Sequence, residues 1–156
     1  MDIQEHHEHG AQARFFDDAV ARIRDAGMKL TTQRVAILRH FEEQFDHMTA
    51  QAIYEALDGQ LDSLSLATVY NSLELFEEMA IVQRLRGRDG QAYFDPNTSP
   101  HHHGICTSCE EIFDIAVAAP SVESMVGQCV SIEDEERDFQ VTSATVLFRG
   151  ICSGCK

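Results

Sequence analysis

Four of the five cysteines form two identical short pairs, and this spacing favours metal binding. Cys106 and Cys109 make one Cys-x-x-Cys turn, and Cys152 and Cys155 make another. Each turn can aim two thiolates at one point about 2.3 Å away, so two turns complete a closed tetrahedral zinc shell. We therefore expect a structural Zn(II), with a redox-active dithiol as the alternative. Cys129 lies among apolar residues and is expected to be a small buried side chain.

A second group of residues offers nitrogen and oxygen ligands instead of sulfur. His101, His102 and His103 are consecutive, and on a strand the first and third point one way and His102 the other. Asp95 precedes them by six residues, and Asp114 lies on the next expected strand. These ligands suit iron, manganese, zinc or nickel, and His102 is a possible extra ligand. The alternative is a histidine-rich surface hairpin.

Two other histidine groups carry weaker signals. His47 stands just before an expected helix, and sequence spacing alone does not join it to the other ligands. His6, His7 and His9 lie in the polar segment 1–10, which is expected to be a mobile, solvated tail rather than a metal site.

The elements that must position these residues change in period near residue 80. Before it, apolar residues recur at helical spacing, with Gly27 as a C-cap and Thr31 or Thr32, Thr49 and Ser65 as N-caps. After it, two short strands flank a turn of two glycines. Helices followed by a hairpin predict a winged helix. The expected elements are a helix over 12–26, helices that begin near residues 32, 50 and 66, and strands at 81–85 and 91–95 around the turn 87–90.

The second half of the chain alternates differently and predicts a separate small domain. Strands are expected at 101–106, 112–117 and 139–149, with a helix from Pro120 to about residue 129 and an acidic loop at 133–138. The fold class is therefore α+β. We expect an N-terminal winged helix-turn-helix DNA-binding domain over 1–95, a hinge at 96–100 and a small α/β dimerisation and metal-binding domain over 101–156.

A helix that enters the major groove exposes short polar side chains, with arginines nearby for phosphates. The helix that begins at Ser65 meets this requirement, as does the hairpin after it. A small helical domain with a solvated arginine-rich turn remains the alternative. The candidate DNA contacts are Arg14, Ser65, Thr68, Tyr70, Asn71, Arg84, Arg86 and Arg88, with Ser72 at the border of the apolar stripe.

The charge balance argues against binding to DNA by charge alone. The formal net charge is -14, and residues 1–95 hold 9 basic and 17 acidic residues. Weak binding to random DNA is expected, with affinity dependent on metal or dimerisation. No apolar run is long enough for a membrane span, and the start lacks the pattern of a secretory signal, so we expect a cytoplasmic protein.

Several segments, in order, resemble the ferric uptake regulator (Fur) family over about Phe15 to Cys155. They are Leu-Thr-Thr-Gln-Arg (30–34), His-Met-Thr-Ala (47–50), Ala-Thr-Val-Tyr-Asn (67–71), Phe-Asp (94–95), His-His-His-Gly-Ile-Cys-Thr-Ser-Cys (101–109) and Cys-Ser-Gly-Cys (152–155). The resemblance implies a homodimeric transcriptional repressor that binds a palindromic, AT-rich operator in double-stranded DNA.

The resemblance also implies a regulatory Fe(II) or Mn(II) site. Carried over residue by residue, its ligands are His47, Asp95, His101, His103 and Asp114. Metal there would fix the angle between the two domains. Asp114 and the Thr-Val-Tyr-Asn segment resemble the peroxide-sensing PerR branch, in which oxidation would fall on His47 or His101. The alternative is an iron-, manganese- or zinc-responsive regulator without peroxide sensing. Residues 141–145 carry no histidine, so no third site using one is expected.

Two other classes of protein account less well for the motifs. An enzyme is not expected, because the chain lacks His-Glu-x-x-His and the zinc-deaminase arrangement of histidine, glutamate and paired cysteines. A metal-buffering protein would account for the ligands, but it would leave the winged-helix half without a purpose.

Overall fold

The computed structural model describes residues 12, 14–87, 90–115 and 146–156 of the 156-residue chain. The chain divides into two compact units, a first unit of Met1–Thr98 and a second unit of Ser99–Lys156. Several predictions lie outside the described residues. These concern the tail 1–10, Arg88, the helix from Pro120, Cys129, the loop 133–138, the segment 141–145 and the start of the strand expected over 139–149.

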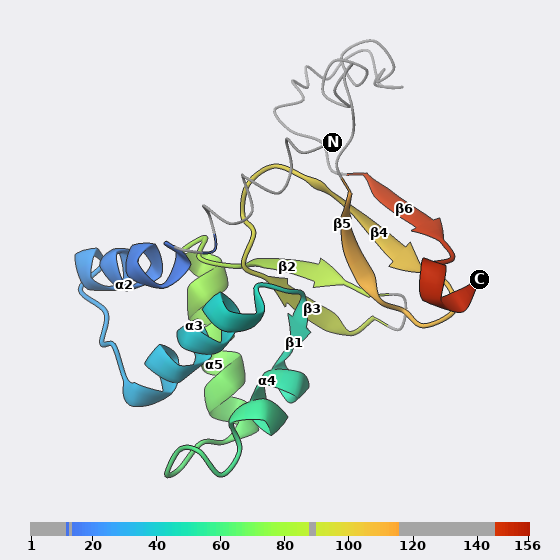
Figure 1. Ribbon diagram of the computed structural model, residues 1–156. Coiled ribbons are helices and arrows are strands. Elements are labelled where there is room, and N and C mark those ends of the chain that lie inside the picture. The colour runs from blue at the N-terminus through green and yellow to red at the C-terminus, as the bar shows by residue number, and fades with distance from the viewer. Residues whose placement is uncertain (1–11, 13, 88–89, 116–145) are drawn as a thin grey trace, which may run out of the picture. The chain divides into compact units, whose positions relative to one another are not determined.

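Among the described residues, the helices of the first unit are α2 (Phe15–Asp25), α3 (Thr32–Gln44), α4 (Ala50–Leu57) and α5 (Leu66–Glu78), shown in Figure 1. Three of the predicted N-caps are present: Thr31, Thr49 and Ser65 each accept a backbone N–H three residues on, at 3.1–3.3 Å. Each cap satisfies one otherwise unpaired donor of the first turn.

The predicted C-cap at Gly27 is also present. Gly27 has φ +68°, a left-handed conformation that glycine adopts without strain. Its N–H donates to the carbonyl of Arg24, and the N–H of Met28 donates to that of Ile23. These two hydrogen bonds form a Schellman motif, which ends α2.

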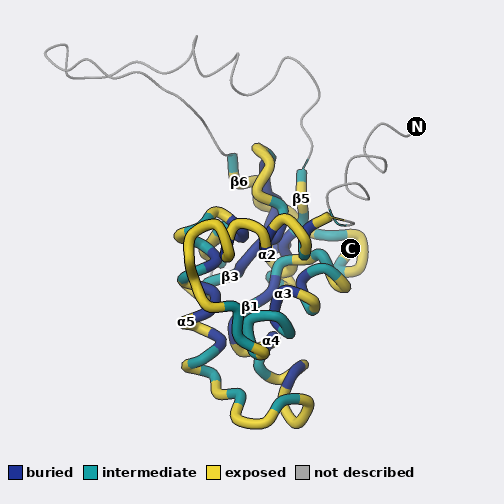
Figure 2. The backbone as a smooth tube through the Cα atoms, turned by 90° about the vertical axis from the view of Figure 1, so that its left-hand side faces the viewer, coloured by how far each residue is buried: buried dark blue, intermediate teal, exposed yellow. Residues whose placement is uncertain are grey.

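A continuous apolar core joins helices α2, α3, α4 and α5. The inward stripes of the helices supply most of it, and they appear as dark blue segments of the tube in Figure 2. The side chains with no exposed surface are Ile23, Ile37, Leu38, Phe41, Ile53, Val69, Leu73, Phe76 and Phe94. Burial of these stripes holds α5 at a fixed angle against α3 and α4.

A three-stranded antiparallel sheet completes the first unit, in the order β1-β3-β2. Strand β2 is Gln83–Arg86 and β3 is Ala92–Asp95. The two-residue strand β1, Met48–Thr49, was not predicted. The prediction that the first wing strand begins at Ile81 is wrong, because the N–H groups of Ile81 and Val82 donate to the carbonyl of Phe76 and close the end of α5.

The second unit contains a mixed three-stranded sheet, in the order β5-β4-β6. Strand β4 is His102–Cys106, one residue shorter than predicted, and all five of its residues are buried. Strand β5, Ile112–Ile115, is antiparallel to it, and β6, Leu147–Gly150, is parallel to it. The short 3-10 helix η1, Ser153–Cys155, follows β6. Among the described residues, no helix has the length and apolarity needed to span a bilayer.

The core predicts a contrast between two aromatic residues of the same helix. Phe76 has no exposed surface and Tyr70 is 44% exposed. We expect Phe76→Ala to lower the free energy of unfolding of the first unit by about 3–5 kcal/mol, because it leaves a cavity. Tyr70→Ala, the matched control, should change it by less than about 0.5 kcal/mol. Chemical denaturation followed by circular dichroism measures both, and equal effects would contradict this core.

Candidate metal centres

The parallel pairing of β4 and β6 brings the two Cys-x-x-Cys turns together. Cys106, the last residue of β4, lies opposite Gly150, the last residue of β6. Because the strands are parallel, both turns leave the sheet at the same end, where the two strands finish. The N–H of Thr107 donates to the carbonyl of Gly150 at 2.7 Å and fixes this junction.

The four thiols fit a zinc ion. Four Sγ atoms all lie within 4.8 Å of one another, those of Cys106, Cys109, Cys152 and Cys155. The Sγ atoms of Cys109 and Cys152 are 3.7 Å apart. A tetrahedron with bonds of about 2.3 Å has edges of about 3.8 Å. All four cysteines are free thiols, so the donor set is that of a closed structural zinc site rather than a disulfide.

The local hydrogen bonds make the four thiols unequal. The pKa of Cys106 is lowered to about 6, first by the backbone N–H of Cys109 and then by those of Cys152 and Ser108. The pKa of Cys109 is raised to about 12: the Glu111 backbone N–H lowers it, but the Cys106 thiol and desolvation outweigh that effect. Cys106 is therefore the thiol most readily ionised, and the metal must displace protons from Cys109 and Cys152, whose pKa values are raised.

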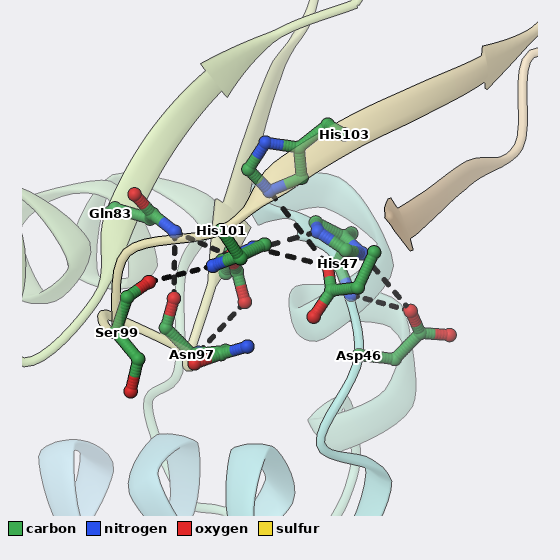
Figure 3. Close-up of polar contacts among 9 residues, drawn as sticks. Asp46, His47, Gln83, Asn97, Ser99, His101 and His103 are labelled. Atoms are coloured by element: carbon green, nitrogen blue, oxygen red, sulfur yellow. Dashed lines mark hydrogen bonds and ion pairs between the residues drawn. The ribbon is translucent and has the colours of Figure 1, made fainter. Parts of the chain in front are cut away.

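In the first unit, strand pairing places His47 beside Asp95. Strand β1 pairs with β3 so that Met48 lies opposite Phe94, and the residues just beyond this pair are His47 and Asp95. The Nε2 atom of His47 is 3.7 Å from Oδ2 of Asp95. Asp46 accepts the backbone N–H of His47 at 2.7 Å, a contact drawn in Figure 3. The first unit therefore offers one imidazole and one carboxylate.

In the second unit, strand pairing places His103 opposite Asp114. Oδ1 of Asp114 is 3.2 Å from Nε2 of His101 and 3.8 Å from Nε2 of His103. The ring centroids of His101 and His103 are 4.3 Å apart. The second unit therefore offers two imidazoles and one carboxylate, a set typical of Fe(II) sites.

A hydrogen bond fixes the tautomer of His101. Its Nδ1 atom is 2.7 Å from the carbonyl oxygen of Ser99, as Figure 3 shows. A carbonyl only accepts, so Nδ1 carries the proton and, in the neutral ring, Nε2 keeps its lone pair toward Asp114. Metal-binding histidines are usually held this way, with the second ring nitrogen donating to a backbone carbonyl or a carboxylate. This arrangement fits a divalent cation.

His102, considered as an extra ligand, does not join this group. Its Nδ1 accepts the backbone N–H of Val146 at 3.3 Å, and its ring lies 6.5 Å from that of Phe148. Alternation along β4 turns it to the other face of the strand. We therefore leave it out of the ligand set.

The predicted DNA-contacting residues differ in how available they are. Ser65, Tyr70 and Asn71 are exposed on α5, and Thr68 is half-buried. Ser72, placed at the border by its spacing, is buried and donates to the carbonyl of Thr68. The polar face of α5 is thus narrower than the sequence predicted.

The arginines are also unequal. Arg14 and Arg86 are exposed. Arg84 instead forms an ion pair of 2.7 Å with Glu77 and lies over the ring of Phe94. Its charge is therefore partly neutralised, because a carboxylate competes with any phosphate for the same guanidinium.

Sequence reasoning missed two residues that contact Asp95. The Nε2 atom of Gln83 donates to Oδ2 of Asp95, and the backbone N–H of Asn97 donates to its Oδ1, both at 2.7 Å. The signal for Gln83 is its position on the strand paired with β3, which is visible only once the hairpin register is known.

A winged helix in one unit and a four-thiol metal cluster in the next define a metal-binding protein of the winged-helix class. The model of the ferric uptake regulator family matches residues 25–149, and the chain belongs to this family. This confirms the resemblance read from the sequence and the α+β fold class that it implied.

Relatives within the family include peroxide-responsive proteins. A peroxide-responsive repressor PerR of Staphylococcus epidermidis is 35% identical over 140 residues, which cover 90% of this chain and 89% of the relative. The PerR structure from Streptococcus pyogenes has a TM-score of 0.50 and 26% identity, and the match covers 90% of this chain and 92% of that one.

A ferric uptake regulator from Francisella tularensis, solved with iron, is also similar. Its TM-score is 0.69 and its identity 27%, and the match covers 83% of this chain and 95% of that one. The similarity in fold therefore spans both units of this chain.

The four-thiol cluster predicts that zinc is needed for the fold of the second unit. We expect Cys106→Ser to lose bound zinc, to lower the melting temperature by about 10 °C or more and to disrupt dimers, because zinc binding contributes folding free energy. Ser108→Ala, in the same turn, is the control and should keep its zinc. Zinc analysis, calorimetry and sedimentation measure the three effects, and a zinc-free Cys106→Ser protein that melts like the wild type would contradict the assignment.

Proposed function

We propose that this chain is a homodimeric, metal-dependent transcriptional repressor that loses DNA binding when peroxide oxidises its metal ligands. The observation that carries the proposal is that each unit holds an incomplete set of nitrogen and oxygen ligands. His47 and Asp95 form one set, and His101, His103 and Asp114 form the other. Membership of the family and the PerR relatives support it.

One regulatory ion shared by both sets would make DNA binding depend on metal. Two or three ligands leave the shell of Fe(II) or Mn(II) open, and five would nearly fill it. An ion that takes all five holds the units at one angle, and without it they are free to reorient. A shift from 1:99 to 99:1 in favour of the DNA-binding arrangement needs about 5.5 kcal/mol of differential metal binding.

The winged helix supplies the proposed DNA contacts. Tyr70, Asn71 and Ser65 present polar groups on α5, and this helix would enter the major groove. Arg86, on the wing strand, is an exposed cation for phosphates. Two such helices in a homodimer read two half-sites about one helical turn apart, so a palindromic operator is expected. That the operator is AT-rich is what the family resemblance implies. We also propose Arg14, Thr68, Arg84 and Arg88 as contacts.

Peroxide sensing would follow from where the imidazoles lie. When bound, Fe(II) supplies the reduction of hydrogen peroxide beside the ligand rings. His47 and His101 are the residues that we expect to gain an oxygen atom, and an oxidised imidazole is a poorer ligand. Mn(II) at the same ligands would support DNA binding and resist peroxide. Structural Zn(II) in the four-thiol cluster keeps no open position and takes no part.

This function makes the protein a regulator rather than an enzyme, and it acts in the cytoplasm, where its DNA lies. Two other functions are outcomes of the experiments below. One is an iron-, manganese- or zinc-responsive regulator without peroxide sensing, and the other is a metal-buffering protein.

The shared site predicts that His47 is needed for metal-dependent DNA binding. We expect His47→Ala to weaken Mn(II)-dependent binding to a palindromic AT-rich duplex by at least about tenfold, because a ligand is lost. His40→Ala, on α3, is the control and should bind like the wild type. A gel-shift titration measures both. A wild-type protein that shifts no such duplex with Fe(II), Mn(II) or Zn(II) would favour metal buffering.

The Fe(II)-loaded protein should lose DNA binding on treatment with hydrogen peroxide, while the Mn(II)-loaded protein keeps it. Mass spectrometry of peptides should show a gain of one oxygen atom at His47 or His101 in the iron form alone. Unchanged peptides and unchanged DNA binding would move the assignment to a metal-responsive regulator without peroxide sensing.

A further inference from the structure

The Gln83 side chain makes two hydrogen bonds to the end of the wing hairpin, one to Asp95 and one to Asn97. Gln83 is the first residue of β2 and lies directly opposite Asp95 in the wing hairpin. Its side-chain Nε2 atom is 2.7 Å from Oδ2 of Asp95 and 2.6 Å from the carbonyl oxygen of Asn97. A primary amide has two N–H bonds, so both are used. Figure 3 shows the Gln83 amide directed at the Asn97 carbonyl.

These bonds fix the orientation of the Asp95 carboxylate. Oδ1 accepts the backbone N–H of Asn97, and Oδ2 accepts Gln83. Rotation of the carboxylate would break both bonds. In this orientation Oδ2 is the oxygen 3.7 Å from Nε2 of His47.

The chemistry of the amide also suits a metal ligand. A lysine or arginine at this position would neutralise Asp95, and a glutamate would repel it. The neutral amide orients the carboxylate and adds no charge of its own to the site. Hydrogen bonds to ligating carboxylates are the usual way in which proteins orient them.

Gln83 also belongs to the wing. The strand that it begins continues to Arg86, and the turn after it is closed by a bond from the N–H of Gly87 to the carbonyl of Gln91. The Gln83 side chain therefore connects Asp95, at the end of the partner strand, to the first strand of the wing. An ion that holds the Asp95 carboxylate in place would also hold the acceptor of the Gln83 hydrogen bond at the start of the wing strand.

We propose that Gln83 is a positioning residue that orients Asp95 for the regulatory metal and links metal occupancy to the wing. The inference rests on the proposed function for the identity of the site. It adds a route from metal to the DNA-binding surface that lies wholly within the first unit and needs no change in the angle between units.

The test compares Gln83→Met with Gln51→Met in the zinc-loaded full chain. Methionine keeps the length of glutamine and removes both donors, and Gln51, on α4, contacts only Glu55 among the hydrogen bonds described for it. We expect Gln83→Met to weaken Mn(II) binding about 10–100-fold, while Gln51→Met binds like the wild type. With the regulatory site empty, both variants should melt within a few degrees of the wild type.

A second measurement follows the wing itself. In the wild type, Mn(II) should slow hydrogen exchange at the backbone amides of 83–87 and 90–95, and in Gln83→Met this slowing should be lost even at saturating Mn(II). A variant that melts far below its control would show a purely structural role and overturn the proposal. So would wild-type affinity and wild-type slowing in Gln83→Met, or no slowing in the wild type.

The failures of the two proposals are distinguishable. A wild-type protein that binds neither Mn(II) nor DNA would end the proposed function and this inference with it. A wild-type protein that binds DNA only with metal, together with an unaffected Gln83→Met variant, would overturn the inference alone.

Discussion

Strand register decides which ligands can meet in this protein. His47 reaches Asp95 because Met48 pairs with Phe94, and Gln83 reaches it because the hairpin places the two opposite each other. The thiols meet because Cys106 pairs with Gly150 across parallel strands. These strands are two to five residues long, and a slip of one residue would turn each ligand to the other face. The packed helices and short turns therefore matter chiefly because they hold register.

Local signals predicted the parts of the fold that depend on local chemistry. Thr31, Thr49 and Ser65 cap helices because a hydroxyl three residues before a free N–H is enough. The four cysteines could be predicted as ligands because each Cys-x-x-Cys turn already holds two of them, although the pairing of β4 with β6 brings the two turns together. His47 could not be joined to Asp95 this way: β1 has two residues, too few for any alternation, and it exists only through its partner strand. Ile81 and Val82 have strand-forming side chains, but they are buried in the core and their N–H groups donate to the carbonyl of Phe76 at the end of α5 instead.

The acidic balance gives the DNA-binding half an unusual constraint. With a formal charge of -14, phosphate attraction contributes little, and the ion pair of Arg84 with Glu77 removes part of what remains. Affinity must then come from groups placed to match the groove. Groups held in place lose less entropy on binding, so order in α5 and the wing is worth more here than in a basic protein. This makes DNA binding sensitive to any contact that stiffens the hairpin.

The four-thiol cluster and the imidazole and carboxylate ligands favour different metals. Four thiolates in a closed tetrahedron favour zinc, which has no redox chemistry and keeps no site for a reactant. Imidazole and carboxylate ligands favour Fe(II) or Mn(II) and suit an open, reactive site. Zinc therefore stabilises the second unit without reacting. The ion that reacts with peroxide would be held by the imidazole and carboxylate ligands. Oxidation of these ligands would end metal-dependent DNA binding but would not unfold the protein. His101 is such a ligand, and the carbonyl of Ser99 fixes its tautomer. Loss of the lone pair on its Nε2 atom would release the ion and leave β4 and the zinc cluster intact.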